Sequence, residues 1–192
     1  MLNTISGLLG DGVPVSLTDY VSISTTTVGA GGAATITFSS IPSTYSHLQI
    51  RVLGRCDAAG SDRESLALMI NSDSGTNYTN HFLQGTGSSA SSSAATGLTG
   101  STNQSGGSSI ITGSTAPANT FGVSIIDILD YANTNKYKVT RSLNGQDQNS
   151  TSGRLGLTSG LWLNTAAITT LTLSAGTGNF VQYSSFALYG IK

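Results

Sequence analysis

Charged residues are scarce in this chain, and that scarcity most constrains what it can fold into. Asp, Glu, Lys and Arg make up only 9% of its 192 residues, against about 25% in typical soluble domains. Runs of Ser, Thr, Gly and Asn alternate with Val, Ile, Leu and Tyr, and 38% of the residues are hydrophobic. Disordered chains are usually charged and poor in apolar residues. We therefore expect a folded all-β protein, of the kind that is secreted or assembled into particles, with a surface of hydroxyls and amides.

The length of the chain indicates how many domains it forms, and its charge limits the kinds of molecule that it can bind. A chain of 192 residues fits one sandwich or barrel domain, which can run to roughly 200–250 residues. The net charge is −1 and the isoelectric point is near 6.0, so no broad basic field is present and we expect no nucleic-acid partner. The opening residues MLNTISGLLGDG lack the positive charge and the apolar length of a signal peptide or membrane span. We expect no membrane partner, and a protein that is made and used in a cytoplasm or leaves it by cell lysis.

Residues 1–20 differ from the rest of the chain. Apolar residues fall at helical spacing, but Gly7, Gly10, Gly12 and Pro14 would end any helix within a turn or two. The pattern predicts an N-terminal arm. Because so short a segment cannot pack on itself, we expect the body or a neighbouring subunit to hold it. The apolar residues of this arm are Leu2, Ile5, Leu8 and Leu9.

From Val21 onward the hydrophobic pattern has a period of two, which is typical of half-buried strands. Leu48, Ile50 and Val52 should share one buried face. Two Thr-rich runs on either side of GAGG predict a hairpin, and turn residues between the later runs suggest a meander. The expected strands are 22–28, 33–40, 47–56, 65–70, 78–84, 110–111, 121–129, 137–143, 155–163, 168–173 and 185–191.

The run at 121–129 carries a second prediction about burial. Ile126 and Ile128 alternate along it, so we expect them in the core, with Phe121 or Val123 nearby.

The low-complexity stretch 85–118 could be a linker between two domains. Neither half of the chain carries enough strands for a comfortable core, so we favour a long surface loop or edge excursion with a short strand at Ile110–Ile111. Short strands at regular spacing, without a helix long enough to connect parallel strands, indicate an antiparallel β-sandwich of jelly-roll type. Residues 21–192 should therefore form one domain.

The sequence contains only weak patterns of possible catalytic residues. Asp127 and Asp130 are three positions apart on a strand, so they should face opposite ways instead of acting as an acid–base pair. Asp130 is better explained as the start of a turn, and Asp127 as a partner for a Lys or Arg on a neighbouring strand. No sequence pattern brings His47 or His81 to a Ser and an Asp, and no GxSxG motif is present. We expect no enzymatic activity and no catalytic residues.

Metal and cofactor patterns are equally weak. Residues 71–77 (NSDSGTN) resemble a calcium loop superficially, but Phe82 stands where an EF-hand places its bidentate Glu, and a β-turn explains the run more simply. One Cys and two His cannot build a closed zinc site, and no glycine-rich run carries a phosphate-binding Lys. Cys56 is best explained as a small apolar residue at a strand end, with a reactive thiol or an intermolecular bridge as alternatives. We expect no metal and no cofactor.

Six aromatic residues are candidates for a binding surface. They could line a carbohydrate or protein contact, but most alternate within strands and are better explained as core or cross-strand pairs. They are Tyr45, Tyr78, Tyr131, Tyr137, Tyr183 and Trp162.

Four phrases of the sequence resemble a family of tailed-bacteriophage virion structural proteins, and the similarity covers nearly the whole body after the arm. They are ITFSSIPSTYSHLQIRVLGR (36–55), VSIIDILDYANTNKYKVTRSLNG (123–145), GLTSGLWLNTAAITTLTL (156–173) and FALYGIK (186–192). Members are described as head decoration, cement or tail-fibre components. The resemblance implies an oligomeric β-sandwich without catalysis, located in the virion.

Two roles in the virion follow from the resemblance. In the first, the protein is a capsid decoration (cement) subunit, expected to be a homotrimer, that binds the major capsid protein; Leu2, Ile5, Leu8 and Leu9 would then anchor it to the shell. In the second, it is a tail-fibre or receptor-binding tip that recognises a bacterial surface glycan. Fibres normally carry coiled-coil heptads or shaft repeats, and this sequence shows neither. We therefore favour decoration of the head surface.

Overall fold

The computed structural model describes residues 19–100, 109–149 and 152–192, and within them it contains twelve strands and no helix. The expected all-β class is therefore confirmed. The strands are β1 Tyr20–Thr27, β2 Thr35–Phe38, β3 His47–Gly54, β4 Arg63–Ile70, β5 Tyr78–Gly85, β6 Ala90–Leu98, β7 Ser109–Thr112, β8 Gly122–Leu129, β9 Lys138–Gln146, β10 Arg154–Trp162, β11 Leu171–Ala175 and β12 Ser185–Ile191.

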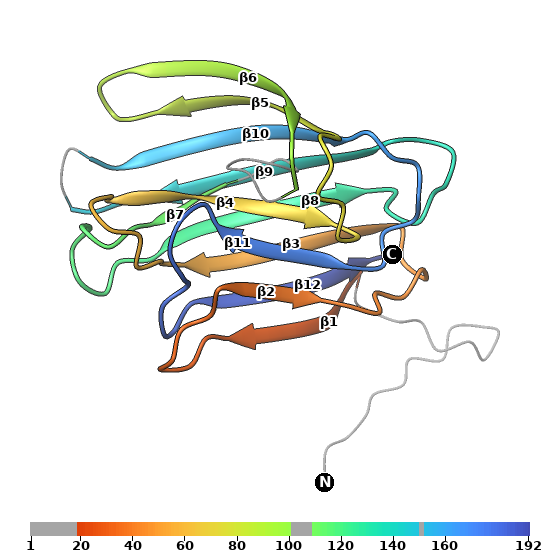
Figure 1. Ribbon diagram of the computed structural model, residues 1–192, viewed down its shortest axis with the longest axis horizontal. Coiled ribbons are helices and arrows are strands. Elements are labelled where there is room, and N and C mark those ends of the chain that lie inside the picture. The colour runs from red at the N-terminus through yellow and green to blue at the C-terminus, as the bar shows by residue number, and fades with distance from the viewer. Residues whose placement is uncertain (1–18, 101–108, 150–151) are drawn as a thin grey trace, which may run out of the picture.

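The strands form two sheets that lie face to face (Figure 1). The large sheet has the order β1-β12-β3-β8-β9-β10-β5-β6, and the small sheet has the order β2-β11-β4-β7. Every pair of neighbouring strands is antiparallel. This arrangement confirms the expected antiparallel β-sandwich. Because the large sheet has twice as many strands, part of it extends beyond the small one.

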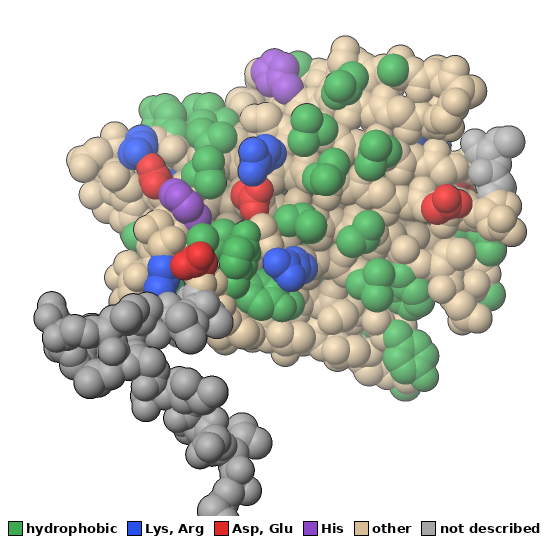
Figure 2. Space-filling model, turned by 180° about the vertical axis from the view of Figure 1, so that it is seen from behind, with side chains coloured by type: hydrophobic (Ala, Val, Ile, Leu, Met, Phe, Trp, Pro, Cys, Tyr) green, Lys and Arg blue, Asp and Glu red, His purple; other side chains and the backbone are tan. Residues whose placement is uncertain are grey.

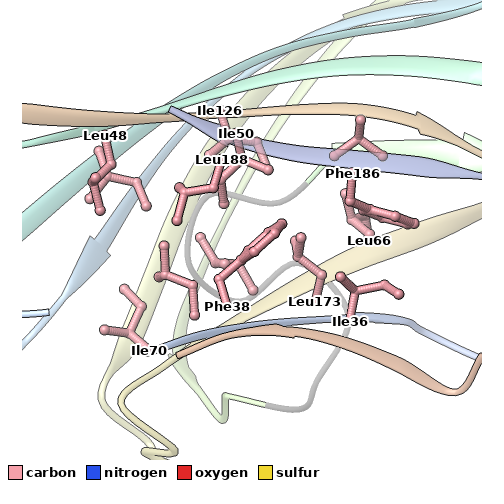
Figure 3. Close-up of a cluster of buried hydrophobic side chains, with 14 of the residues drawn as sticks. Ile36, Phe38, Leu48, Ile50, Leu66, Ile70, Ile126, Leu173, Phe186 and Leu188 are labelled. Carbon is pink, nitrogen blue, oxygen red and sulfur yellow. The ribbon is translucent and has the colours of Figure 1, made fainter. Parts of the chain in front are cut away.

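The apolar core lies between the two sheets, and Figure 3 shows side chains from both converging there. Leu48 and Ile50 are 0% exposed and Val52 is 2% exposed, as the alternation predicted. Ile126 and Ile128 are also fully buried. Each such side chain stabilises the fold by roughly 1.5–3 kcal/mol relative to an exposed one.

The prediction that Val123 would join this core is wrong. Val123 is 51% exposed on the opposite face of β8, and Ser124 is buried instead. Phe121, the other residue named, is half-buried. The strand is apolar on both faces, so its alternation could not show which phase points inward.

The predicted hairpin between residues 22–28 and 33–40 is also wrong. β1 pairs with β12, whereas β2 pairs with β11 in the other sheet. The residues that flank the glycine turn bond to the C-terminal part of the chain instead of to each other: Val28 N donates to Ser184 O at 2.8 Å, and Ala33 N donates to Phe180 O at 3.0 Å. A glycine-rich turn can connect two sheets as well as two paired strands, and only tertiary pairing distinguishes the cases.

Two other connections differ from expectation. β3, β4 and β5 alternate between the sheets, so they do not form the expected meander. The Ser-rich stretch contains a full strand, β6, which was not predicted and which pairs with β5 at the edge of the large sheet. Its sequence, ASSSAATGL, has no apolar alternation to mark it.

Arg55 organises the loop 114–120. Its guanidinium donates to the backbone carbonyls of Ser114, Ala116, Pro117 and Thr120 at 2.8–3.1 Å. Because the five N–H donors of an arginine form a rigid fork, one side chain can satisfy several loop carbonyls at once. Arg55 thus makes most of the hydrogen bonds that hold the loop, and Ser114 Oγ and Thr115 N add bonds to the backbone of Ala58 and Ser61.

Candidate interaction surface

The outer face of the large sheet, which points away from the core, carries a row of aliphatic residues. The rows of paired residues place Ile125, Leu143, Leu157 and Leu83 side by side on the adjacent strands β8, β9, β10 and β5. Directly opposed residues on neighbouring strands have Cβ atoms about 4.5–5.5 Å apart. The four side chains therefore form a continuous apolar stripe across the sheet.

Nine aliphatic residues in all are exposed on this face, each by 37–61%. Figure 2 shows hydrophobic side chains spread across it, with few charged ones between them. Single exposed apolar residues need no explanation, but contiguous patches mark interaction sites. We call these residues the aliphatic face; they are Leu53, Leu83, Val123, Ile125, Leu129, Val139, Leu143, Leu155 and Leu157.

The aliphatic face is hollowed. Three hollows of about 910, 700 and 280 Å³ lie along it. The smallest adjoins both others, because it shares Leu83 and Leu157 with one, and Gly85 and Leu155 with the other. The 700 Å³ hollow is lined from Ser92 on β6 to Leu129 on β8, so the sheet curves around it. We call the combined hollow the trough.

Polarity is inverted in the strands beneath the trough. On the core side of β9, all five alternate residues are polar and buried, whereas Val139 and Leu143 are exposed on its outer side. β10 is similar, with Thr158 buried and Leu155 and Leu157 exposed. A half-buried sheet normally places its apolar residues toward the core. In β9 and β10 the outer face is therefore the apolar one.

Lys138 shows how the polar inner side of β9 is satisfied. It is only 1% exposed, and its ammonium donates to the backbone carbonyls of Asn133, Lys136 and Thr165. Burial lowers the pKa of this lysine. Three carbonyl acceptors match its three N–H donors, so this residue connects two loops and offers nothing to a ligand.

Arg51 and Asp127 are charged residues on the outer face of β3 and β8, and Arg141, which pairs with Asp127, lines the 700 Å³ hollow. The guanidinium of Arg51 lies 5.5 Å from the ring centre of Tyr20 and 4.9 Å from that of Tyr189, so the ion is held between two aromatic rings. Its Nε donates to Gln49 Oε1 at 2.9 Å. Asp127 accepts from Arg141 and Gln49, each at 2.8 Å. Arg51 forms no ion pair with a carboxylate among the described residues; Arg154, which lines the 910 Å³ hollow, also lacks one.

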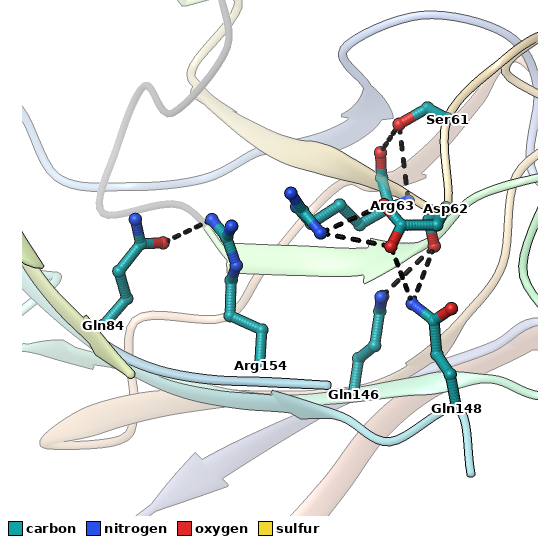
Figure 4. Close-up of polar contacts among 7 residues, drawn as sticks. All are labelled: Ser61, Asp62, Arg63, Gln84, Gln146, Gln148 and Arg154. Atoms are coloured by element: carbon teal, nitrogen blue, oxygen red, sulfur yellow. Dashed lines mark hydrogen bonds and ion pairs between the residues drawn. The ribbon is translucent and has the colours of Figure 1, made fainter. Parts of the chain in front are cut away.

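A second polar cluster lies near one end of the trough (Figure 4). Asp62 accepts from Arg63 Nη1 at 3.0 Å, and Gln148 Nε2 donates to Asp62 Oδ2 at 3.3 Å. Arg154 Nη1 donates to Gln84 Oε1 at 2.7 Å. The one carboxylate of this cluster is held by an arginine and an amide, so it is arranged to join loops and strands instead of exchanging protons.

The structure brings His47 beside Asp130, with 3.6 Å between His47 Nδ1 and Asp130 Oδ1, but among the described residues it gives neither of them a serine partner. Asp127 pairs with Arg141 on the adjacent strand β9, as predicted. Asp130 accepts from Lys136 in the turn after β8, also as predicted, and its pKa is lowered chiefly by the hydrogen bond with Lys136. His47 Nδ1 accepts from the backbone N of Asp130 at 3.0 Å, and His81 is exposed in the wall of the trough.

Residues 71–77 form a turn held by Asp73. The sequence favours a turn here over a calcium loop. Asp73 accepts from Trp162 Nε1 at 2.8 Å and from Asn77 and Gly75, each at 2.9 Å. Burial would raise the pKa of Asp73, but these three hydrogen bonds outweigh it and lower the pKa. Within the described parts of the chain, no three His, Cys, Asp or Glu residues gather as a metal site would require.

Cys56 and most of the aromatic residues are core residues. Cys56 is 0% exposed, directly after β3, and burial raises the pKa of its thiol. Tyr78, Tyr131 and Trp162 are buried, and burial raises the pKa of Tyr78 to about 12. Tyr45 is half-buried. Of the six aromatic residues considered from sequence, the exposed pair are Tyr137 at 52% and Tyr183 at 67%.

The predicted anchoring residues Leu2, Ile5, Leu8 and Leu9 lie outside the described residues. Sequence reasoning missed the aliphatic face. The signal was present in runs such as SIIDIL and LGLTSGL, where aliphatic residues occupy the outward phase of the alternation, but a period of two was used only to find the core.

Comparisons with known proteins give no relative: no family model matches the chain, and neither the curated proteins nor the solved structures contain a match. Among the described residues, no helix is long and apolar enough to cross a membrane.

Proposed function

We propose that this protein is a non-enzymatic structural component of a bacteriophage virion, namely a capsid decoration (cement) protein that binds the major capsid protein and stabilises the head shell. The observation that carries this proposal is the aliphatic face: nine aliphatic side chains are exposed on it, and four of them are on β9 and β10, where the polarity is inverted. Apolar residues exposed on this scale suit a protein that works by contact with another protein.

The chemistry of the trough favours a protein partner over a glycan. The exposed lining of the 700 Å³ hollow is mostly apolar, with Leu83, Leu129, Val139 and Leu157 beside polar residues such as Ser92, Thr140 and Arg141. Sugar sites need polar groups that bond to hydroxyls, and aliphatic side chains offer none. The trough therefore supports head decoration above recognition of a surface glycan by a tail fibre.

Strand order supports the finer proposal of a jelly-roll topology. Setting aside β5, β6, β9 and β10, the remaining eight strands have the orders β1-β12-β3-β8 and β2-β11-β4-β7. Numbered one to eight along the chain, they pair as first with eighth, second with seventh, third with sixth and fourth with fifth. This is the pairing of a rolled-up double Greek key, a fold common in viral capsid and lectin domains. The four extra strands then extend one sheet and carry most of the trough.

Copy number in purified particles tests the role directly. A homotrimeric decoration subunit on the head surface should be present in proportion to the major capsid protein. Quantitative mass spectrometry of virions, with the major capsid protein as internal standard, measures this ratio. A few copies per particle would contradict decoration and favour a tail protein.

Binding of the purified protein to undecorated shells tests the surfaces involved. We expect deletion of residues 1–12 to abolish co-sedimentation with shells, because burying each of Leu2, Ile5, Leu8 and Leu9 on a capsid subunit would contribute on the order of 1.5–3 kcal/mol. The two-sheet core begins only after residue 19, so the melting temperature and the oligomeric state should not change. Full occupancy by the truncated protein would contradict the anchoring role, and unfolding would show that the segment is part of the body.

A further inference from the structure

β6 forms one edge of the large sheet, and among the described strands its only partner is β5. Figure 1 shows it at the end of the sheet farthest from β1. Residues 90–94 are all exposed, so this part of the strand faces solvent on both sides of the sheet. A strand with one free side presents unpaired backbone donors and acceptors, which can bind a strand of another chain.

The hydrogen bonds of the β5–β6 hairpin determine which backbone groups point outward. Thr86 N donates to Ser89 O at 2.9 Å, so these two residues share a hydrogen bond across the ladder, and Ala90 begins the next pair. Hydrogen-bonded and non-hydrogen-bonded pairs alternate along an antiparallel ladder. Ala90 is therefore in a non-hydrogen-bonded pair, and so is every second residue after it. The N–H and C=O groups of Ala90, Ser92 and Ala94 thus point away from β5.

The three other edges of the two described sheets carry features that limit pairing with a second chain. β2 and β7, the edges of the small sheet, have four residues each. β1 has an irregularity in its pairing between Ser22 and Ser24. In β6 the register is regular from Ala90 to Ala95, and this segment contains no proline and no charged residue. Short strands, bulges, prolines and charges are the usual protection of an edge, so β6 is the unprotected one.

We propose that β6 pairs with β6 of a second copy of the chain, antiparallel and with Ser92 at the centre. Two identical antiparallel strands are related by a two-fold axis, so one residue lies opposite its own copy. With Ser92 at the axis, Ala90 lies opposite Ala94 of the second copy. All three outward-pointing residues of each strand then exchange N–H···O=C bonds, which gives about six hydrogen bonds.

The side chains also fit this register. Ser92 meets its own copy on the outer face, and Ser91 lies opposite Ser93 of the second copy on the inner face, where paired hydroxyls can bond across the strands. A register centred on Ser93 would extend the contact to Thr96. There the ladder between β6 and β5 is irregular, and Gly97 has a φ of 64°. The regular part of the strand is therefore best used with Ser92 at the axis.

A second copy fits this edge better than a foreign strand. Strands that add to a sheet edge owe their specificity to sites for alternate side chains. The Ser and Ala side chains of β6 offer little to distinguish one foreign strand from another, whereas a second copy brings the same small side chains and the same hydrogen-bond phase. Pairing with β1 of a neighbouring copy is less favourable, because β1 is irregular at Ser22 and Ser24.

The two-fold axis would also align the aliphatic faces of the two copies. Ser92 is in register with Leu83 on β5, and Leu83 belongs to the stripe that continues across β10, β9 and β8. Because the axis is perpendicular to the sheet, both outer faces lie on the same side, and the two stripes form one line. The inference goes beyond the virion role and does not rest on it. The contact is two-fold, so it is distinct from the three-fold contact of a homotrimer.

Single cysteines on β6 test the register in the purified protein. Ser92→Cys should form a disulfide-linked dimer under mild oxidation, because the two Cα atoms at the axis are about 5.5 Å apart, within the range of a disulfide. The matched control Ser93→Cys should not, because its own copy is one strand and two residues away, about 8 Å and beyond the roughly 7 Å limit. The native Cys56 is fully buried and should not compete.

Non-reducing mass spectrometry measures the fraction of linked dimer in each variant. Equal linkage of the two variants would overturn the proposal, because it would indicate random collision. Absence of linkage in Ser92→Cys would also overturn it, and is the result expected if β6 pairs with β1 of a neighbour or with another protein.

Proline tests the backbone bonds without a cysteine. The N–H of residue 92 points outward, so Ser92→Pro removes a bond to the second copy but none to β5, and proline is tolerated at such edge positions. Sedimentation equilibrium should show that this variant has about half the mass of the parent. The control Ser92→Ala keeps the N–H and should not change the mass.

The circular dichroism spectrum shows whether each variant is folded. An unchanged mass for folded Ser92→Pro would overturn the proposal, and if that variant unfolds, the cysteine pair still decides. Both experiments use the isolated protein, without shells or virions, so their failure is distinguishable from failure of the virion role.

Discussion

The two halves of the large sheet place their apolar residues on opposite sides. In β12, β3 and the C-terminal part of β8, the side chains of Leu188, Ile50 and Ile126 point toward the small sheet and are fully buried. In β9 and β10, Ser142 and Thr158 point inward while Leu143 and Leu157 point outward. The first half is stabilised by an apolar core within the chain. The second half has polar side chains on the inside, and its apolar residues lie on the outer face.

The largest effect should come from the apolar half. Replacing Ile50 with Ala leaves a cavity between the sheets and should lower the free energy of unfolding by roughly 2–5 kcal/mol. Urea denaturation followed by circular dichroism measures this loss. The matched control is Leu53→Ala on the same strand but on the outer face, where 46% exposure predicts a much smaller loss. A larger effect for Leu53 would reverse the assignment of the faces.

In the polar half, Lys138→Met should be the most damaging single change. It keeps the length of the side chain but removes the donors for three backbone carbonyls, and buried polar groups left unsatisfied cost roughly 1–3 kcal/mol. Lys136→Met serves as the control, because that side chain is exposed and its ammonium binds only at the surface. Equal thermal stability of the two variants would show that the buried ammonium does not support the loops.

The stability of the protein in acid tests the role of Asp73 in the turn 71–77, which joins the two sheets. The folded pKa of Asp73 is lowered, so this carboxylate contributes stability that is fully present above its unfolded pKa, near 3.9, and is lost as the pH falls through the folded pKa. Asp73→Asn should therefore make the stability depend less on pH below about 4. Melting temperatures from pH 2 to 7 measure this slope, and an unchanged slope would contradict the assignment.

The smallest change in stability should come from the outer face of the polar half. Leu157→Ser should alter the free energy of unfolding by only about 0.5 kcal/mol, because the side chain is 48% exposed. The same variant should weaken binding to undecorated shells. Normal shell binding together with a large loss of stability would show that the aliphatic face is structural.

Alternation in the sequence was sufficient to predict the sandwich and the buried positions Leu48, Ile50 and Val52. In β8 it placed Ile126 and Ile128 correctly but misplaced Val123, because Val123 and Ile125 on the outer face are as apolar as Ile126 and Ile128 on the inner face. It also could not find β6, because Ser and Ala carry no pattern of burial. The sequence could not predict which strands pair, because a turn such as GAGG has the same local chemistry within a sheet and between sheets. The trough depends on the faces of β8, on the presence of β6 and on the pairing of the strands. It was therefore visible only in the structure.

The pairing of β1 with β12 has a consequence for synthesis of the protein. β1 leaves the ribosome among the first residues, but its partner spans Ser185–Ile191 at the other end of the chain. At roughly 5–20 residues per second, β1 waits on the order of ten seconds or more without its neighbour. β2 and β11 are separated almost as widely. The large sheet can therefore be completed only once β12 has been synthesised, and a product terminated before Ser185 would lack the strand that pairs with both β1 and β3.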